Sequence, residues 1–312
     1  MSTRLRQIKT HLPTATMFPG FKEFDIAVTP EVTIHGIRAG DGPPLLLLHG
    51  FPQTHHIWHK VTPELMKSFT VVAIDLRGYG SSSKPPSTTS DSHKAYSKSA
   101  MGADCLAVMS SLGYPRFSIL SHDRGARIAF KLSVDHPEVV EKLMMLDIAP
   151  TLAMFEKTDQ FFATAYWHWF WLIQPAPFPE KLMMSDPELF KEKFFGGGYA
   201  GKGGFIDEKA MGEYMGMFRD EAGVHAMCED YRAAATIDLV EARRDREEGR
   251  KIKCPVRVLW GDKGVIEKSF DCLEEWRSVS DGEVSGESVP AGHYIAEEVP
   301  EILLKHVKEF FG

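Results

Sequence analysis

The stretch FSILSHDRG, residues 117–125, joins an apolar run to a helix-like segment through a turn centred on Asp123. The small residues Ser121 and Gly125 flank Asp123 at a spacing of two. A nucleophile elbow requires this spacing, because its central side chain sits on a tight, strained turn where bulky neighbours would clash. The alternative interpretation is an Asp that caps the following helix, since Asp is a favoured N-cap residue.

Short apolar runs alternate with amphipathic segments over the first 150 residues. The sequence predicts strands at residues 43–50, 69–78, 117–123 and 141–148, and helices at residues 98–112 and 124–133. Strands that alternate with helices are joined by right-handed crossovers. We therefore predict an α/β fold with a mostly parallel sheet and helices on both of its faces.

The pattern changes after Pro150, where the chain becomes rich in aromatic residues, methionine and charge and shows no convincing strand-like run. A strand pattern returns at residues 256–261, and residues 302–311 resemble a closing amphipathic helix. We predict a helical cap, residues 151–245, inserted after the strand that ends at Asp147. The core then comprises residues 1–150 and 246–312. The glycine-rich stretch 195–204 lacks the Lys-Ser/Thr ending of a phosphate loop, so we interpret it as a connection.

Composition and charge limit the classes of partner. The 312 residues include 36 Lys and Arg against 43 Asp and Glu, a net charge of −7, which argues against binding of nucleic acid. No apolar run approaches the length of a membrane span, and the N-terminus lacks the apolar stretch of a secretory signal. The four cysteines form no CxxC pair, so we expect packed, reduced thiols. We expect a soluble, cytoplasmic protein that acts on a small molecule, with no nucleic acid or membrane partner.

Two further segments complete a nucleophilic site around Asp123. His49-Gly50-Phe51 follows a predicted strand, where the backbone N–H of Phe51 can join that of Arg124 in an oxyanion hole. We expect His49 itself to have a structural role at the end of the strand. His293, in Ala291-Gly292-His293, lies between a predicted strand and the last helix, which suits a general base on a loop.

A general base of this kind needs a carboxylate to orient it. The usual place is a Gly-x-x-Asp loop after the strand at residues 256–261, but here Gly261-Asp262-Lys263-Gly264 puts a glycine at that position. The other place is Asp147, at the end of the preceding strand. A carboxylate buried after an apolar run needs a partner, and His293 would supply one. We favour Asp147 over Asp262 for this role.

The type of nucleophile selects the reaction. An Asp that attacks a carbonyl gives a mixed anhydride, whereas an Asp that attacks a saturated carbon displaces a leaving group and gives an ordinary ester. Water activated by His293 can then cleave that ester while Asp147 stabilises the imidazolium. An Asp nucleophile therefore indicates carbon–halogen or epoxide cleavage and disfavours serine-esterase chemistry.

Arg124 and Arg127 lie in the first helical turn after Asp123, three residues apart and hence on nearly the same face. Cations oppose the macrodipole at a helix N-terminus, so this pair favours an anion bound beside it. We interpret the two guanidinium groups as a clamp for a substrate carboxylate. The alternative is that one or both arginines pair with carboxylates of the protein.

The chain order Asp123, Asp147, His293 resembles the α/β-hydrolase family, and within it the branch with an aspartate nucleophile. That branch holds haloalkane dehalogenases, epoxide hydrolases and fluoroacetate (haloacetate) dehalogenases. The motifs HGFPQ, DLRGYGSSSKP, SHDRGAR and the closing GH carry the resemblance over nearly the whole chain. Residues 165–170, AYWHWF, and 174–177, QPAP, are similar specifically to fluoroacetate dehalogenases. Ser121 departs from the Gly often found at its position.

The resemblance implies an α/β-hydrolase fold and hydrolytic dehalogenation of short 2-haloacids. It implies that Arg124 and Arg127 bind the substrate carboxylate and that the halide is bound by His168, Trp169 and Tyr231. It also implies a homodimer, and we expect no cofactor and no metal. The main alternative is epoxide hydrolysis by the same three catalytic residues, with acid donors drawn from Tyr231 and Tyr166 or Tyr214. A non-catalytic small-molecule receptor is the alternative from another class.

Overall fold

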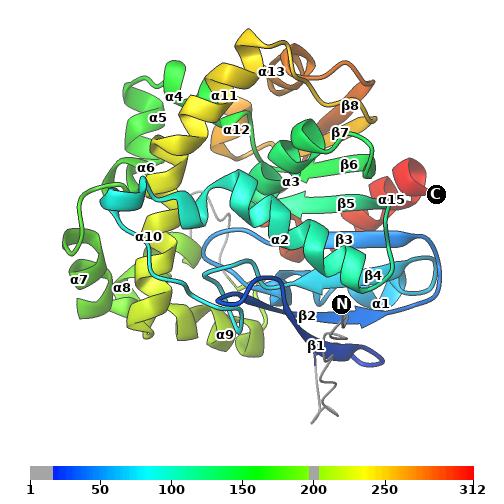
Figure 1. The fold of residues 1–312 in the computed structure, drawn as a ribbon, viewed down its shortest axis with the longest axis horizontal. Helices are drawn as coiled ribbons and strands as arrows, with labels where there is room; N and C mark the ends of the chain where they lie inside the picture. Colours follow the sequence, from blue (N-terminus) through cyan, green and yellow to red (C-terminus); the bar gives the residue numbers. More distant parts are fainter. Residues whose placement is uncertain (1–16, 197–203) are drawn as a thin grey trace, which may run out of the picture.

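Eight strands form one sheet in the order β1-β2-β4-β3-β5-β6-β7-β8 (Figure 1). The computed structural model describes residues 17–196 and 204–312, so most of the glycine-rich stretch 195–204 lies outside the described residues. The strands are β1 (Lys22–Ala27), β2 (Thr33–Ala39), β3 (Pro44–Leu48), β4 (Thr70–Ile74), β5 (Phe117–His122), β6 (Val140–Leu146), β7 (Val256–Gly261) and β8 (Val284–Val289). Neighbours from β4 to β8 pair in parallel, whereas β1 and β2 are antiparallel at one edge.

The predicted apolar runs correspond to the central parallel strands, β3 to β7. A parallel sheet is covered on both faces, so its strands read as continuous apolar runs. In β3, Leu46 and Leu48 join the core on one face, while Leu45 and Leu47 join the core on the other. β1 and β2 escape prediction because their half-buried sequences, KEFDIA and TIHGIRA, mix polar and apolar residues over a short length.

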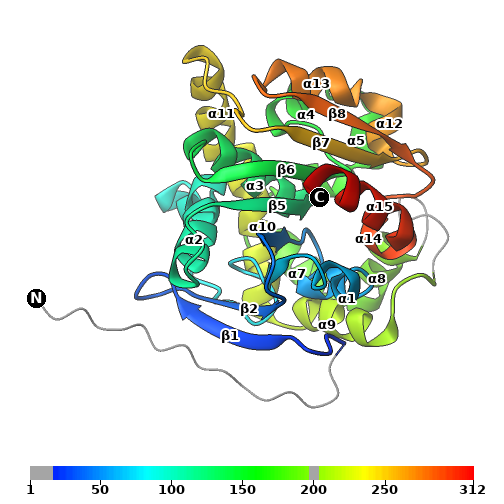
Figure 2. The ribbon, with the colours of Figure 1, turned by 90° about the vertical axis from the view of Figure 1, so that its right-hand side faces the viewer.

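Helices cover both faces of the sheet, which confirms the predicted fold class. Those that flank the sheet are α1 (Thr62–Leu65), α2 (Lys98–Ser111), α3 (Asp123–Asp135), α12 (Val265–Ser269), α13 (Cys272–Ser278), α14 (Ile295–Glu298) and α15 (Pro300–Phe311). Figure 2 shows α2 and α3 on one face and α1, α14 and α15 on the other. Within the described residues, no helix combines the length and the apolar character needed to cross a membrane.

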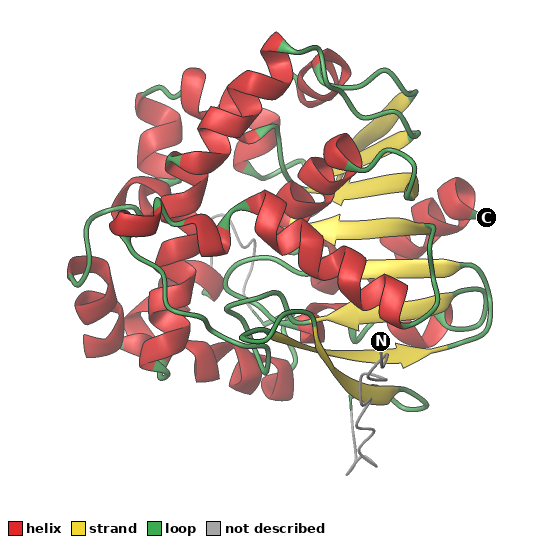
Figure 3. Cartoon of the chain, viewed as in Figure 1, coloured by secondary structure: helices red, strands yellow, loops and turns green. Residues whose placement is uncertain are grey.

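The helices between β6 and β7 are α4 (Thr151–Glu156), α5 (Gln160–Ala165), α6 (Trp167–Leu172), α7 (Phe178–Ser185), α8 (Pro187–Phe195), α9 (Glu208–Phe218), α10 (Glu221–Ala235) and α11 (Ile237–Glu247). They gather beside the edge of the sheet at which the parallel strands end (Figures 1 and 3). Asp75, Asp123 and Asp147 directly follow β4, β5 and β6 at this edge. The division of the chain into a core and a separate cap stays a prediction.

Candidate active site

Asp123 stands on a strained turn between β5 and α3. Its φ of +42° lies in the left-handed region that non-glycine residues rarely adopt. The backbone around it is tightly packed, because a Cβ on Gly125 would lie 2.2 Å from the carbonyl oxygen of His49, and one on Gly50 would lie 2.6 Å from the Cβ of Asp123. The side chain does not cap α3. Its Oδ2 instead accepts a hydrogen bond of 3.0 Å from the backbone N–H of Phe51.

This hydrogen bond places one carboxylate oxygen of Asp123 in the position expected for an oxyanion. The backbone nitrogen of Arg124, the other predicted donor, lies on the same side, since a Cβ on Gly50 would be 2.9 Å from it and from Asp123 Oδ2, but within the described chain only Phe51 donates a hydrogen bond to this oxygen. Burial raises the pKa of Asp123, but the charges of His293 and Arg127 outweigh it and hold the pKa below its usual value. Asp123 is therefore an ionised, buried carboxylate.

Asp147 and His293 form a hydrogen-bonded pair. His293 Nδ1 lies 2.6 Å from Asp147 Oδ2, while Asp147 Oδ1 accepts a bond of 3.0 Å from the backbone N–H of Gly261. Burial lowers the pKa of His293, but the bond to Asp147 outweighs it and raises the pKa above its usual value. Asp262, the other acid considered, is exposed. The structure thus brings the favoured acid to the predicted base.

His49 has the structural role expected of it. Its Nε2 accepts a hydrogen bond of 3.0 Å from the backbone N–H of Leu76, and its Nδ1 lies 3.0 Å from the carbonyl oxygen of Gly50. Burial lowers the pKa of His49 to about 4, so the ring is neutral near pH 7. The ring ties the loop that carries Phe51 to the segment after β4.

Arg124 is engaged by a carboxylate of the protein, the alternative left open for this pair. Its Nε and Nη2 donate to the two carboxylate oxygens of Asp230 over 3.1 and 2.7 Å, and its guanidinium lies 4.3 Å from the ring centroid of Tyr231. Both side chains of the ion pair are fully buried. Sequence reasoning missed Asp230. The signal that could have found it is its position directly before Tyr231, combined with the rule that a buried arginine needs an acid.

Arg127 has no carboxylate partner among the residues that the structure describes. Its Nη1 donates to Thr151 Oγ1 over 2.8 Å and to the carbonyl oxygen of Ala149 over 3.2 Å, and its guanidinium lies 4.7 Å from the Trp169 ring. Burial lowers its pKa to about 10, which leaves it a cation at neutral pH. Arg127 Nε and Arg124 Nη1 are both buried and lack a hydrogen-bond partner within the described chain. Such unpaired donors are costly and call for an acceptor.

A cavity of about 50 Å³ lies in front of Asp123 and His293. It holds little more than one or two waters' share of volume, so it suits a very small ligand. Its walls are Phe51, Asp123, Tyr166, Trp167, His168, Trp169, Lys193, Phe194, Tyr231, His293 and Tyr294. Neither arginine is among its lining residues, but each guanidinium group stacks on the ring of a lining residue, Arg124 on Tyr231 and Arg127 on Trp169.

The three side chains expected to bind halide, His168, Trp169 and Tyr231, all line this cavity. Burial lowers the pKa of His168 to about 3 and raises that of Tyr231 well above its usual value. Both side chains therefore stay uncharged near pH 7 and keep a proton to donate. Tyr166 lines the cavity too, whereas the hydroxyl of Tyr214 donates to Glu297 Oε1 over 3.1 Å, outside it.

Glu298 holds the loop that carries His293 and has no counterpart in the sequence-based site. Its carboxylate accepts hydrogen bonds from the backbone N–H groups of Gly292 and Tyr294, over 2.8 and 2.9 Å. These residues flank His293 on both sides. The role could not be inferred from sequence, because an acid in the first turn of a helix usually serves only the helix.

Comparison with known proteins is consistent with this geometry. A family model of the alpha/beta hydrolase fold matches residues 43–298. The chain is 42% identical to a fluoroacetate dehalogenase from a Burkholderia species over 95% of both chains. It is 28% identical to a soluble epoxide hydrolase from Corynebacterium sp. (strain C12), over 89% of this chain and 93% of that one. A structure from Nostoc sp PCC 7120, assigned to the alpha/beta hydrolases, shares 48% identity and a TM-score of 0.88 over 94% of this chain and 99% of that one. The chain is therefore a hydrolase that belongs to the alpha/beta hydrolase fold family.

Proposed function

We propose that this hydrolase cleaves the carbon–halogen bond of short 2-haloacids such as fluoroacetate or chloroacetate. The observation that carries the proposal is the buried, ionised carboxylate of Asp123, which faces the same cavity of about 50 Å³ as His293. The similarity to a fluoroacetate dehalogenase over 95% of the chain supports this substrate class. The small cavity favours a substrate of two or three carbon atoms.

The first step is an SN2 displacement by Asp123. Its Oδ2 is held by the N–H of Phe51, while no hydrogen bond engages Oδ1 within the described residues, so Oδ1 is the attacking atom. A bond forms between Oδ1 and the substrate's α-carbon as the carbon–halogen electron pair leaves with the halide. The product is an ester on Asp123, with inversion at the carbon. N–H and O–H donors of His168, Trp169 and Tyr231 stabilise the departing halide.

The second step hydrolyses that ester. His293 takes a proton from water, and the hydroxide attacks the carboxyl carbon of Asp123. The N–H groups of Phe51 and Arg124 stabilise the oxyanion, and Asp147 stabilises the imidazolium that forms. The imidazolium returns its proton to the leaving 2-hydroxy acid. Halide and one proton are released overall.

Substrate selectivity rests on Arg124 and Arg127. Each keeps one buried N–H without a protein partner among the described residues, at Nη1 and Nε. A substrate carboxylate supplies the acceptor that these donors lack, and Arg127 forms no ion pair with a carboxylate of the described residues, although the charge of Asp123 acts on it. We assign Arg127 the larger share of this interaction, because Asp230 already engages Arg124.

The test is halide release measured with an ion-selective electrode on fluoroacetate and chloroacetate. We expect Asp123→Asn to lower the turnover rate by about 10⁴-fold or more. The matched control is Asp262→Asn, which removes an exposed carboxylate on the loop after β7 and should leave turnover unchanged. Full activity in the Asp123→Asn variant, or absence of halide release from both haloacids by the wild type, would overturn the proposal.

Epoxide hydrolysis is the second candidate function, favoured by one observation. Tyr166 and Tyr231 both line the cavity that Asp123 lines, and a tyrosine hydroxyl beside a nucleophile can protonate an epoxide oxygen. The 28% identity to a soluble epoxide hydrolase points the same way. A styrene oxide assay run beside the haloacid assay separates the two, because a neutral epoxide gives Arg127 no partner.

We also infer a homodimer and a cytoplasmic location, which agree with the resemblance to small-molecule dehalogenases. Sedimentation velocity on the full chain tests the first inference, and cell fractionation tests the second. A monomer at micromolar concentration, or recovery outside the cytoplasmic fraction, contradicts the respective inference.

A further inference from the structure

A second and larger cavity of about 500 Å³ lies beside the antiparallel strands β1 and β2. It shares none of its lining residues with the cavity at Asp123. Its wall includes His35 from β2, His55 from the segment after β3, and Asp75 directly after β4. The proposed function does not use these three side chains.

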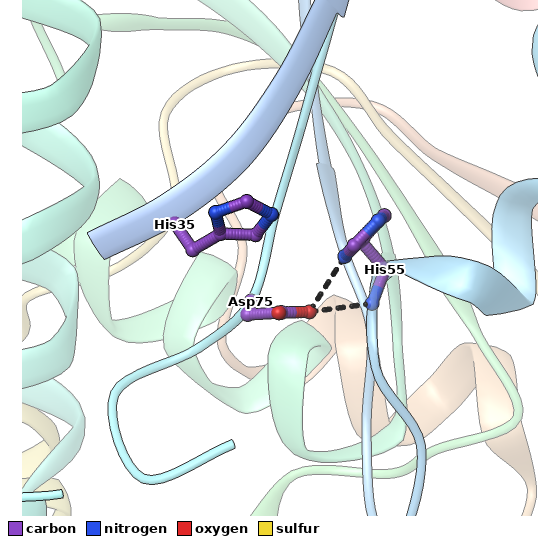
Figure 4. Close-up of side chains that lie close together, drawn as sticks. All are labelled: His35, His55 and Asp75. Carbon is purple, nitrogen blue, oxygen red and sulfur yellow. Dashed lines mark hydrogen bonds and ion pairs between the residues drawn. The ribbon is translucent and has the colours of Figure 1, made fainter. Parts of the chain in front are cut away.

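The three side chains converge on one point. His35, His55 and Asp75 each offer one donor atom, and the three atoms all lie within 4.8 Å of one another. His55 Nδ1 lies 2.8 Å from Asp75 Oδ1. Figure 4 shows the ring of His35 beside this pair, with one ring nitrogen turned toward His55. A first-row divalent ion with bonds of about 2.0–2.2 Å holds its ligand atoms roughly 3–4 Å apart, which this triangle can meet.

The orientation of His35 is typical of a metal ligand. Its Nδ1 lies 3.0 Å from Asp25 Oδ1, which directs the other nitrogen, Nε2, away from that carboxylate. A carboxylate on one ring nitrogen and a metal on the other is the recurrent outer-shell arrangement of histidine ligands. Asp25 therefore fixes the ring in the way that a metal site requires.

The electrostatics favour a cation. Asp75 is buried, with 2% of its side chain exposed, and its ion-pair partner within the described residues is His55 alone. Glu23 and Glu213 also line the cavity, against one lysine, Lys209. A buried carboxylate in a negative surrounding gains from a positive ion.

We propose that His35, His55 and Asp75 bind a Zn²⁺-type divalent ion. Two imidazoles and one carboxylate suit zinc, and the adjoining cavity provides water for the fourth position. The ion takes the place of the proton between His55 Nδ1 and Asp75 Oδ1, and the neutral His55 ring then carries its single proton on Nε2. The proposal departs from the expectation of no metal drawn from the sequence. Because His55 lies four residues after Phe51, the ion braces the loop that carries one oxyanion N–H.

The test is a titration of the chelator-treated full chain with Zn²⁺ by calorimetry, together with the visible d–d absorption of Co²⁺. We expect one equivalent to bind to the wild type, and His35→Gln to weaken binding about tenfold or more. His35 is the ligand to change, because 15% of its side chain is exposed, against 6% for His55 and 2% for Asp75. Circular dichroism on the metal-free variant confirms that it is folded.

The matched control is His59→Gln. His59 lies on the same segment as His55, but its Nδ1 makes a hydrogen bond with the carbonyl oxygen of His56. Binding to this control should equal that of the wild type. The variant His293→Gln distinguishes the cluster from the Asp147–His293 pair and should also keep the Co²⁺ spectrum. Absence of binding to the wild type, or equal loss in His59→Gln and His35→Gln, would overturn the proposal, as would loss in His293→Gln.

Discussion

Two histidine–aspartate pairs lie at the same edge of the sheet. In both, an Asp directly follows a parallel strand and its Oδ lies close to a histidine Nδ1, at 2.6 Å for Asp147–His293 and 2.8 Å for Asp75–His55. The Asp147–His293 pair faces a third carboxylate, Asp123, which stands on a strained turn and has one oxygen without a hydrogen bond in the described chain. A histidine–aspartate pair alone therefore does not determine the chemistry, which depends on the groups that face the pair.

The Asp75–His55 pair has different neighbours. Both oxygens of Asp75 are engaged, since Oδ1 accepts from the backbone N–H of His55 and Oδ2 from that of Ser81. The group facing this pair is another imidazole, that of His35, and no strained nucleophile stands opposite it in the described residues. These neighbours support the two proposals, that the Asp147–His293 pair activates water and that the Asp75–His55 pair holds a cation.

Replacement of His293 in the Asp147–His293 pair gives the largest expected effect, a loss of steady-state turnover. We expect His293→Gln to form the ester on Asp123 but to hydrolyse it slowly, so that steady-state turnover falls by about 10³-fold or more. Mass spectrometry of the protein after incubation with chloroacetate should show one substrate-derived adduct on the peptide that contains Asp123. The control is His59→Gln, with unchanged turnover and no adduct. Turnover without an adduct in His293→Gln would contradict the ester mechanism.

Replacement of Arg127 tests whether the site around Asp123 and the Asp147–His293 pair recognises an anionic substrate. We expect Arg127→Gln to lower kcat/KM for chloroacetate by about 10- to 100-fold, mostly through KM, because one charged donor to the carboxylate is lost. Turnover of a neutral epoxide, where detectable, should not fall. Arg246→Gln removes an exposed arginine that pairs with Glu156 and serves as the control. An equal loss on charged and neutral substrates would indicate a structural role for Arg127.

The pH dependence of ester hydrolysis tests whether His293, of the Asp147–His293 pair, is the general base. The general base must be neutral, and the bond to Asp147 raises the pKa of His293 above its usual value of 6.5. The rate should therefore increase with pH as His293 loses its proton, and the charge of Asp123, which is lost in the ester, no longer adds to the effect of Asp147. Asp147→Asn removes the partner that raises this pKa and should move the midpoint down. The single-turnover hydrolysis rate between pH 5 and 9 is the measurement, and an unchanged midpoint in Asp147→Asn would count against the assignment.

Glu297 contacts the loop that joins Phe51 to His55, and its replacement gives the smallest expected effect. Gln53 Nε2, on the loop between Phe51 and His55, donates to Glu297 Oε2 over 2.6 Å, and burial raises the pKa of Glu297 to about 8. Because the folded pKa is above the unfolded one, the stability from this group is complete below about pH 4.5 and is lost as pH rises through 8.

The variant Glu297→Gln removes that titration. We expect the free energy of unfolding of the wild type to fall by roughly 1–4 kcal/mol more than that of the variant between pH 5 and pH 9. Urea unfolding at the two pH values is the measurement. Parallel pH profiles for the two proteins would show that Glu297 is already ionised at pH 5.

The sequence by itself determined the features that depend on neighbouring residues. Continuous apolar runs predict β3 to β7, because strands buried on both faces have no polar alternation. The elbow at Asp123 follows from the small residues two positions away, which the close contacts of Gly125 explain. The preference for Asp147 over Asp262 also holds geometrically, since the carboxylate at the end of an apolar run was the one in need of a partner.

Only the tertiary structure decided the features that join distant parts of the chain. Asp230 reaches Arg124 across 106 residues, and the triangle of His35, His55 and Asp75 comes from three separate segments. The triangle leaves no local pattern, because side chains at the ends of different strands meet only after packing has fixed the backbones. The position of Asp230 beside Tyr231 is a signal, but it does not by itself point to Arg124. Burial then sets the charge states, and it depends on everything around a residue rather than on its neighbours in sequence.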